Sequence, residues 1–473
     1  MSRTPILIRD VEVAGVPGVD VRLEDGRIFE IGPRLARTGA EIAGNGGALI
    51  PGLADHHIHL FALAAQAESV SLDGVTNTDA FRTRIAAAAA MRPPGAWLRV
   101  TGYHEAMAGE LSRLELDACA PAHPLRVQHQ TGSLWILNSR GLDAVGDLGS
   151  PVVERDAGGK PTGRIWRGDA WLRQQIGEHA PPLASVGRRL AAFGITALTD
   201  ASVTTDAQAA ERLAAAHRAG ELPQRLTLMS GGPLGAPADG AFAVGPVKVL
   251  LDDHDLPDID AFARLIAEAR RWRRTVGVHC VTAAELAVAL AAFEAAGARV
   301  GDRIEHGGLI PEDAIAQLKA LELTVVTQPG FIRERGDRYA AMVEPREHAD
   351  LYRCASLLAA GVPVAASSDA PYASPDPWVA MKSAVDRRSR GGLCIGAAER
   401  VTPAQALTLY LGSADAPGGP PRRVEVGAPA DLCLLATPLQ EALQALSAQL
   451  VRATFVGGRM IHHADDVTEL ATP

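Results

Sequence analysis

The sequence predicts an α/β protein, a (β/α)8 TIM-like barrel with a small β-sandwich domain formed by both termini of the 473-residue chain. Three observations lead to this fold. Short apolar runs alternate with alanine- and leucine-rich segments through the middle of the chain, as expected of repeated βα units. Both ends of the chain have the pattern of short strands. Histidines and one aspartate fall at the ends of central strand-like runs, where barrel enzymes place their active sites.

Four runs at the two ends of the chain alternate as short strands do: residues 6–15, 19–32, 424–436 and 451–462. Asp25-Gly26 supplies the positive φ that a tight hairpin turn requires. Neither end is long enough to bury its own apolar face. We therefore expect residues 1–50 and 415–473 to form one discontinuous β-sandwich domain, with the barrel at 51–414.

Eight runs are candidate barrel strands: residues 48–59, 97–104, 194–200, 247–251, 275–280, 303–307, 324–329 and 362–369. Alanine-rich segments of helical length follow several of them. Residues from about 105 to 185 fit the repeat poorly, because they are rich in glycine, proline and polar residues. We expect an insertion or lid over the catalytic face there, since functional loops of barrels accumulate after the strands.

Composition excludes several classes of protein. Hydrophobic residues make up 47% and charged residues 21%, which is typical of a packed enzyme. The net charge of -9 gives no reason to expect nucleic acid or an anionic membrane surface as partner. No secretory signal or apolar run of about 18 residues is present, and the five scattered cysteines indicate reduced thiols. We expect a cytoplasmic protein with a small-molecule substrate, and a homodimer is left open.

His57 and His59 are the first candidates for a metal site. They lie in the run Asp55-His56-His57-Ile58-His59, which continues an apolar strand-like segment. Side chains at i and i+2 of a strand point to the same face, so the two imidazoles can face one ion. The same alternation places Asp55 on that face, where its carboxylate would orient a liganding imidazole. Without further residues, the pair is equally consistent with packed or solvated histidines.

Lys248 lies inside the apolar run at 247–251, where an unpaired ammonium group is costly to bury. One interpretation is a lysine at the strand mouth that binds a carboxylate. The other is that burial removes its proton. The neutral amine can then react with CO2 to give a carbamate, an anionic bidentate ligand able to bridge two metals.

His279, His306 and Asp369 each end a strand-like run, at TVGVH, RIEH and VAASSD. Either histidine alone is more typical of a structural role. Two histidines at equivalent positions of successive βα units, together with the His-x-His pair, favour one shared metal site. The carboxylate of Asp369 is suited to bind metal and to take a proton from metal-bound water.

These motifs resemble those of the amidohydrolase superfamily. The matching segments are PGLADHHIH at 51–59, VKVLL at 247–251, VGVHC at 276–280, RIEHG at 303–307 and SSDAP at 367–371. The resemblance covers almost the whole chain, because the family pairs its barrel with a β-sandwich made from both termini. Within the superfamily the chain is similar to the branch that includes N-substituted formamide deformylase, amidohydrolase family 3. Further matches to this branch are PTGRIW at 161–166, GITALTD at 194–200 and DPWVAMKSAVDRR at 376–388.

The resemblance implies a role for each candidate ligand. His57 and His59 would bind the more buried metal, and His279 and His306 the second one. Lys248 would be carboxylated and bridge the two. Zn²⁺ is the expected cofactor, as one or two ions, because imidazole and carboxylate ligands suit it; other divalent metals stay open.

The implied reaction is hydrolysis of a carbon–nitrogen bond other than a peptide bond, in a small amide, formamide or cyclic amide. A metal-bound hydroxide would attack the carbonyl carbon, and the metal would stabilise the oxyanion. Asp369 would be a ligand of the first metal and the general acid/base. The alternatives are deamination of a heterocycle, ester or lactone hydrolysis or decarboxylation on the same metal site, and a noncatalytic barrel scaffold.

Six further polar residues are candidates for substrate binding: His104, Gln128, His129, Arg164, Gln328 and Tyr372. Gln328 and Tyr372 follow predicted strand tips. The other four fall in or near the expected lid, where most polar residues are only solvated or fold the loop locally. The segment 127–139, VQHQTGSLWILNS, departs from the Asp-Gly-His-type element usual in the branch, so His129 is displaced and the substrate preference is not transferred.

Overall fold

The computed structural model describes residues 4–37, 39–146, 148–176 and 181–464. These residues form two compact units, one of residues 1–60 and 183–473 and one of residues 61–182. The outermost parts of the expected sandwich, 1–3 and 465–473, lie outside the described residues, as do residue 147 and residues 177–180 of the expected lid. None of the helices in the described part of the chain is long and apolar enough to cross a lipid bilayer.

The first unit contains an eight-stranded sheet whose neighbouring strands are all parallel. In chain order, its strands are β6 (Leu53–Ile58), β13 (Ile195–Asp200), β14 (Arg225–Ser230), β15 (Ala243–Leu250), β16 (Val276–Cys280), β17 (Arg303–His306), β18 (Thr324–Thr327) and β19 (Val364–Ala366). The spatial order equals the chain order, as in a (β/α)8 barrel. The predicted fold class is therefore confirmed.

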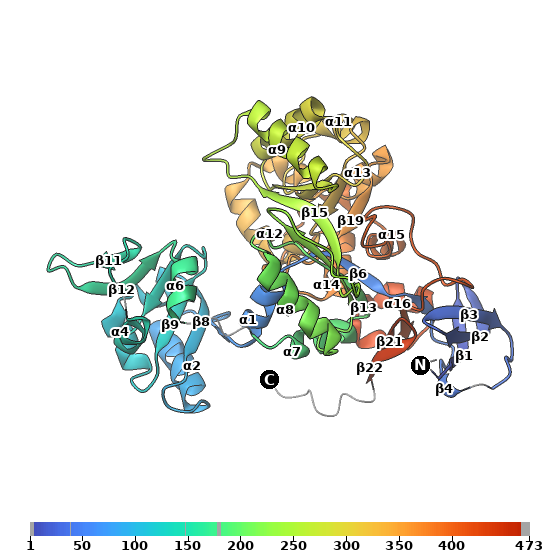
Figure 1. Cartoon of the computed structure of the whole chain (residues 1–473), viewed down its shortest axis with the longest axis horizontal. Helices are drawn as coiled ribbons and strands as arrows, with labels where there is room; N and C mark the ends of the chain where they lie inside the picture. The colour runs from blue at the N-terminus through green and yellow to red at the C-terminus, as the bar shows by residue number, and fades with distance from the viewer. Residues whose placement is uncertain (1–3, 38, 147, 177–180, 465–473) are drawn as a thin grey trace. The chain divides into compact units, whose positions relative to one another are not determined.

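Helices follow most of the barrel strands along the chain. They are α7 (Ala184–Ala192), α8 (Ala207–Arg218), α9 (Ile259–Arg271), α10 (Ala283–Ala296), α11 (Ala314–Ala320), α12 (Gly330–Met342), α13 (Ala355–Ala360), α14 (Pro377–Asp386) and α15 (Pro403–Thr408). Figure 1 shows α8, α9 and α10 at the periphery of the sheet. Side-chain caps start several of them, including a capping box of Thr282 and Glu285 on α10. These caps satisfy backbone amides that helix ends leave open.

Hydrogen bonds beside the candidate site join the last barrel strand to the first. The backbone amide of Asp369 donates to the carbonyl of His57 at 2.8 Å, and that of His59 donates to Ala370 at 2.9 Å. Asp55 contributes through its side chain, because its Oδ1 accepts the amide of Ser368 at 3.1 Å. The segments after β6 and β19 are thus held together where the candidate ligands emerge.

One predicted barrel strand was wrong. Residues 97–104 contain β8 (Leu98–Tyr103), which pairs with β7 and β9 in the second unit instead of entering the barrel. The barrel position is filled by β14, whose sequence RLTLMS was not recognised as a strand. A short apolar run does not reveal which parallel sheet it joins. In addition, no helix follows β14 before β15, so the βα repeat is interrupted there.

The sandwich consists of two four-stranded sheets that share one apolar core. The first sheet has β1 (Ile6–Val13), β2 (Val16–Glu24), β3 (Arg27–Gly32) and β4 (Ala40–Ala43); the second has β5 (Leu49–Pro51), β20 (Leu432–Leu435), β21 (Val451–Val456) and β22 (Arg459–His463). Buried side chains such as Val11 and Leu23 from one sheet and Leu432 and Phe455 from the other belong to the same cluster. Helix α16 (Leu439–Ala445) connects β20 to β21. Both ends of the chain therefore build this core together.

The second unit is a six-stranded mixed sheet with helices on both faces. Its strand order is β11 (Val153–Arg155), β12 (Pro161–Trp166), β10 (Leu134–Leu137), β9 (Leu125–His129), β8, and β7 (Val70–Ser71). Leu134 and Ile136 pack with side chains of α2 (Thr78–Ala90) and α4 (Arg113–Cys119). Trp135 and Leu137 point to the other face, toward α5 (Ser139–Val145) and α6 (Asp169–Ile176).

This unit is inserted in the chain between the first and second barrel strands, β6 and β13. It begins at residue 61, earlier than the expected start of an insertion near 105, because β7, β8 and α2 belong to it. Helices α1 (Leu60–Ala67) and α3 (Glu105–Ala108) complete its elements. Whether the unit serves as a lid stays a prediction.

Candidate metal centre

The six predicted ligands come from strands one, four, five, six and eight of the barrel. His57 lies on β6 and His59 directly after it; Lys248 is on β15, His279 on β16 and His306 on β17, and Asp369 follows β19. Except for Lys248, which lies two residues before the end of β15, all stand at or near the carboxyl ends of their strands. In a parallel barrel these ends share one rim, the rim that carries active sites.

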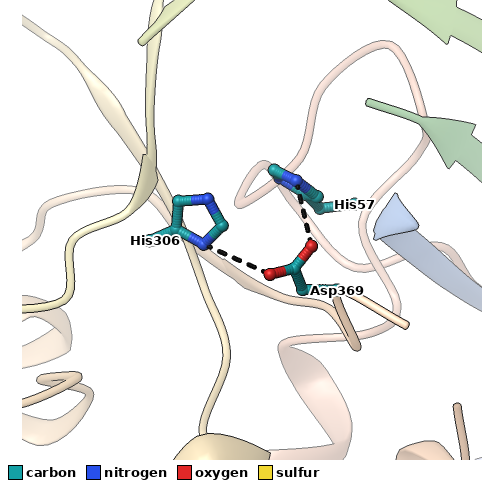
Figure 2. Close-up of side chains that lie close together, drawn as sticks. All are labelled: His57, His306 and Asp369. Atoms are coloured by element: carbon teal, nitrogen blue, oxygen red, sulfur yellow. Dashed lines mark ion pairs between the residues drawn. The ribbon is translucent and has the colours of Figure 1, made fainter. Parts of the chain in front are cut away.

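Three of the six form a compact group. His57, His306 and Asp369 are buried, and one possible ligand atom from each lies within 4.8 Å of the others. His57 Nε2 is 3.5 Å from Asp369 Oδ1, and His306 Nδ1 is 3.8 Å from Asp369 Oδ2. Figure 2 shows one carboxylate oxygen facing each ring. Two imidazoles and a carboxylate around one point are a ligand set that suits zinc and other divalent transition metals.

The other two histidines adjoin this group. His59 Nε2 is 3.1 Å from Asp369 Oδ1, and the rings of His57 and His59 are 5.3 Å apart between centroids. The His279 ring is 4.4 Å from that of His306. The structure therefore brings four histidines and one carboxylate to the same part of the rim, and their role as ligands stays a prediction.

Lys248 is buried, with 3% of its surface exposed, and its Nζ has no hydrogen-bond partner among the residues that the structure describes. Burial lowers the pKa of Lys248, because a charged ammonium is poorly solvated there. The Nε2 atom of His57 is likewise buried without a hydrogen-bond partner in the described part of the chain. Buried polar atoms of this kind normally have partners. A cation at this rim, bound by His57 and by a carboxylated lysine, would supply them.

The backbone turns inward at two of the candidate ligands. His306 has a φ of +72° and Asp369 a φ of +52°, both in the left-handed region that non-glycine residues rarely adopt. Each lies where the chain leaves or has left a barrel strand. Such conformations cost about 1–3 kcal/mol and persist at functional sites where the surroundings enforce them.

Each of three imidazoles has a polar neighbour at its Nδ1 atom. His57 Nδ1 is 2.5 Å from Glu305 Oε2, His59 Nδ1 is 3.1 Å from Ser202 Oγ, and His306 Nδ1 is 2.8 Å from Gln328 Oε1: three separate partners for three rings. A hydrogen bond at Nδ1 fixes the ring and leaves Nε2 available for a metal. Gln328 was predicted to bind substrate, which stays a prediction; in the structure its Oε1 contacts His306.

Two carboxylates near the rim have contacts that the sequence did not predict. Asp55 does not orient an imidazole; its Oδ1 accepts the backbone amides of His57 and Ser368. The alternation of side chains along β6 places Asp55 on the expected face, but backbone amides of β6 and of the segment after β19 donate to its oxygen. Asp200, at the end of β13, was not predicted. It accepts the amides of Leu60 at 2.8 Å and Ser202 at 3.0 Å, which holds the Ser202 hydroxyl beside His59.

Burial and mutual charge keep most of the histidines neutral. Burial, followed by the charge of Lys248, lowers the pKa of His279 to about 4 and that of His57 well below its usual value. Burial and then the neighbouring histidines lower the pKa of His306 in the same way. Burial also acts to lower the pKa of His59, but its hydrogen bond to Asp369 and that residue's charge raise it overall. Neutral imidazole is the form that binds metals.

The remaining substrate-binding candidates fall into two groups. Tyr372 is 57% exposed, and its ring stands 5.8 Å from that of His59. The other four belong to the second unit. His104 precedes α3 at the N-cap position, without a capping hydrogen bond from its side chain. Gln128 lies 3.4 Å from Arg99, His129 lies 3.2 Å from Glu105, and Arg164 stacks over Trp166. Local contacts thus engage three of these four, and substrate binding by any of them stays a prediction.

A profile of the amidohydrolase family matches residues 40–462. The chain belongs to this family. This amidohydrolase is 26% identical to N-substituted formamide deformylase of Arthrobacter pascens, over 95% of this chain and 96% of that protein. An uncharacterized metal-dependent hydrolase of Pyrococcus horikoshii OT3 has a similar structure, with a TM-score of 0.73, 19% identity and coverage of 90% and 96% of the two chains. N-isopropylammelide isopropylaminohydrolase of Burkholderia multivorans shares the fold, with a TM-score of 0.55, 18% identity and coverage of 98% and 99%.

The family and its rim of histidines make the chain a metal-dependent amidohydrolase, as the sequence predicted.

Proposed function

We propose that this amidohydrolase cleaves a carbon–nitrogen bond other than a peptide bond in a small amide, formamide or cyclic amide, with zinc at the barrel rim. The observation that carries the proposal is the buried group of His57, His306 and Asp369, together with the buried Nζ of Lys248, which has no hydrogen-bond partner among the described residues and interacts electrostatically with Asp369. The likeness to N-substituted formamide deformylase supports an acyl–nitrogen substrate. The described cysteines are all free, in keeping with a cytoplasmic enzyme.

Two cation positions follow from the arrangement of the ligands. His57 and His59 lie on one side of Asp369 Oδ1 and would hold the first cation with it. The His279 and His306 rings meet edge to face and would hold the second. Lys248, once neutral, would add through Nζ to CO2, forming an N–C bond and releasing a proton, and the resulting carbamate oxygens would reach both positions.

A bound divalent cation would polarise the substrate carbonyl and bring the pKa of water from about 15.7 to roughly 7. The protein's own part in the reaction is to move the proton. Asp369 Oδ1 faces His57 and His59, and Oδ2 lies 3.8 Å from His306 Nδ1. Oδ2, the oxygen with fewer close histidines, would accept the proton of the attacking water and deliver it to the leaving nitrogen. Tyr372, exposed beside His59, would contact the substrate at the entrance.

The proposal is tested with zinc-loaded protein and a panel of formamides, N-acyl amino acids, hydantoins and lactones. We expect turnover of members of the first three classes. In Asp369→Asn, turnover should fall by about 10²–10⁴-fold while the zinc content, measured by elemental analysis, is retained. Hydrolysis confined to lactones would contradict the substrate class. Unchanged turnover in Asp369→Asn would contradict the proton-transfer role.

A further inference from the structure

His57 differs from the other histidines of the rim in the residue that contacts its Nδ1 atom. Its partner is Glu305, fully buried, whose Oε2 lies 2.5 Å away. The second oxygen of the same carboxylate, Oε1, lies 2.5 Å from Nε of Arg303, which is also buried. His59 and His306 have neutral partners instead, a hydroxyl and an amide oxygen.

The strand register explains how this chain of contacts forms. Arg303 and Glu305 are two residues apart on β17, so both side chains leave the same face of the strand. The neighbouring strand β16 has a glycine opposite them, because Gly277 pairs with Arg303. A Cβ atom at Gly277 would lie 2.8 Å from Glu305 Oε1 and 2.6 Å from Cε of Met229. The missing side chain leaves the space that the carboxylate fills.

A carboxylate at Nδ1 acts on the ring in ways that a neutral partner does not. It accepts only, so the ring proton must stand on Nδ1 and the lone pair on Nε2 faces Asp369. A charged acceptor also makes the stronger hydrogen bond and raises the basicity of the liganding nitrogen. Arg303 offsets the charge of Glu305, because its guanidinium forms an ion pair with the carboxylate in the same buried space.

We propose that Glu305 is a positioning residue that fixes the tautomer of His57 and strengthens cation binding at the site His57 shares with Asp369, and that Arg303 holds it in place. The inference rests on the proposed function, since it concerns the same metal centre. It assigns the first cation position a higher affinity than the second, because the hydrogen-bond partner of His306 Nδ1 is the neutral amide oxygen of Gln328, and the Asp369 carboxylate lies farther from that atom, at 3.8 Å.

A second buried ion pair, whose carboxylate lies directly before the same strand, provides a matched control. Asp302 directly precedes Arg303, is fully buried, and pairs with Arg270 through both carboxylate oxygens. It also accepts the amide of Val276 at 2.9 Å. Its described contacts include no histidine. Loss of its charge therefore tests what removal of a buried carboxylate does to the fold alone.

The experiment compares Glu305→Gln with Asp302→Asn. Zinc affinity of the folded, metal-free proteins is measured by competition with a coloured chelator, and thermal unfolding is measured in parallel. We expect zinc to bind about 10–100-fold more weakly to Glu305→Gln at the tighter site. Asp302→Asn should keep the wild-type affinity even where it unfolds at lower temperature. Equal affinities of Glu305→Gln and wild type, or equal losses in both variants, would overturn the assignment.

Two further readouts keep the proposal testable if Glu305→Gln does not fold. Gly277→Ala pushes on Glu305 Oε1 without touching a ligand, and it should weaken zinc binding in the same direction. In wild-type protein with ¹⁵N-labelled histidine, the Nδ1 resonance of His57 should be that of a protonated nitrogen; protonation on Nε2 would overturn the inference. Wild-type protein that binds no zinc at all would overturn the proposed function as well, whereas normal binding with an unchanged variant would overturn only the role of Glu305.

Discussion

Replacement of Lys248 by methionine should stabilise the metal-free protein, although it removes a residue of the proposed metal centre. The lysine is buried and its Nζ has no hydrogen-bond partner among the described residues. Methionine has a similar length and no charge, so it can fill the same space without the unsatisfied ammonium group. The gain should be measurable because the folded wild type must either bury the charge or release the proton.

The largest possible gain follows from the ordinary lysine pKa of 10.5. Release of the proton at about pH 7.5 costs 1.36 kcal/mol for each of three pH units, which sets a ceiling of about 4 kcal/mol. Burial lowers the pKa of Lys248 in the folded state, so the unfolded state binds more protons and wild-type stability rises with pH up to 10.5. The difference from the variant should therefore shrink, to at most about 1.4 kcal/mol at about pH 9.5.

The assay is urea denaturation followed by circular dichroism, with chelator present and CO2 removed. Lys319→Met is the matched control, because Lys319 is exposed and its replacement should change stability little at any pH. With zinc and bicarbonate restored, the wild type should become the more stable protein, since only Lys248 can form the carbamate. A Lys248→Met protein that is less stable than wild type without metal, by the same amount at both pH values, would refute the reasoning.

Three further predictions concern the metal, the entrance and the sandwich. Chelation should abolish turnover and lower the unfolding temperature, and zinc at about 100 times its Kd should restore about 2.7 kcal/mol of stability; the same temperature with and without zinc would contradict this. Tyr372→Ala should reduce kcat/KM by roughly fivefold, about 1 kcal/mol, mainly through a higher KM. Steady-state kinetics measures both constants, and an unchanged kcat/KM would contradict a substrate contact of Tyr372. Phe455→Ala should destabilise the sandwich by about 3–5 kcal/mol, because the ring is fully buried in its shared core. A free energy of unfolding in urea equal to that of the wild type would contradict this prediction.

The sequence predicted the barrel and its rim because strand tips with histidines recur at regular places in the chain. His279 and His306 stand at equivalent positions of successive βα units, and the structure places their rings side by side. Both short β-rich ends were expected to share one sheet domain, and the buried cluster of Leu23 and Phe455 joins them. These features depend on local pattern and on the geometry of parallel strands, which a sequence displays directly.

Other parts of the fold depend on choices that local pattern does not record. The run containing β8 and the run containing β14 are both short and apolar, and only tertiary pairing decides that β14 enters the barrel. Because β8 was taken for a barrel strand, the start of the second unit was placed near residue 105 instead of 61.

The partners of the candidate ligands were the hardest to predict. Asp55 was assigned to an imidazole from its place in the His-x-His run, but backbone amides occupy its oxygen. Glu305 was overlooked, although its motif contains a signal. Arg303 and Glu305 are two charged residues at i and i+2 of a strand that is buried throughout, and buried charges must be paired. That the pair also meets His57 is a contact across 248 positions of the chain, which only the fold reveals.

The most direct test of the metal centre is X-ray absorption at the zinc edge of the zinc-loaded protein. The account predicts imidazole and oxygen neighbours at about 2.0–2.2 Å and no sulfur neighbour, although Cys280 adjoins His279 in the chain. With both positions filled, a zinc–zinc distance of about 3.5–4 Å should be visible. Sulfur neighbours of the zinc would contradict the account. So would a spectrum that shows no imidazole neighbours and does not change in His57→Ala, because it would mean that these side chains do not bind the cation.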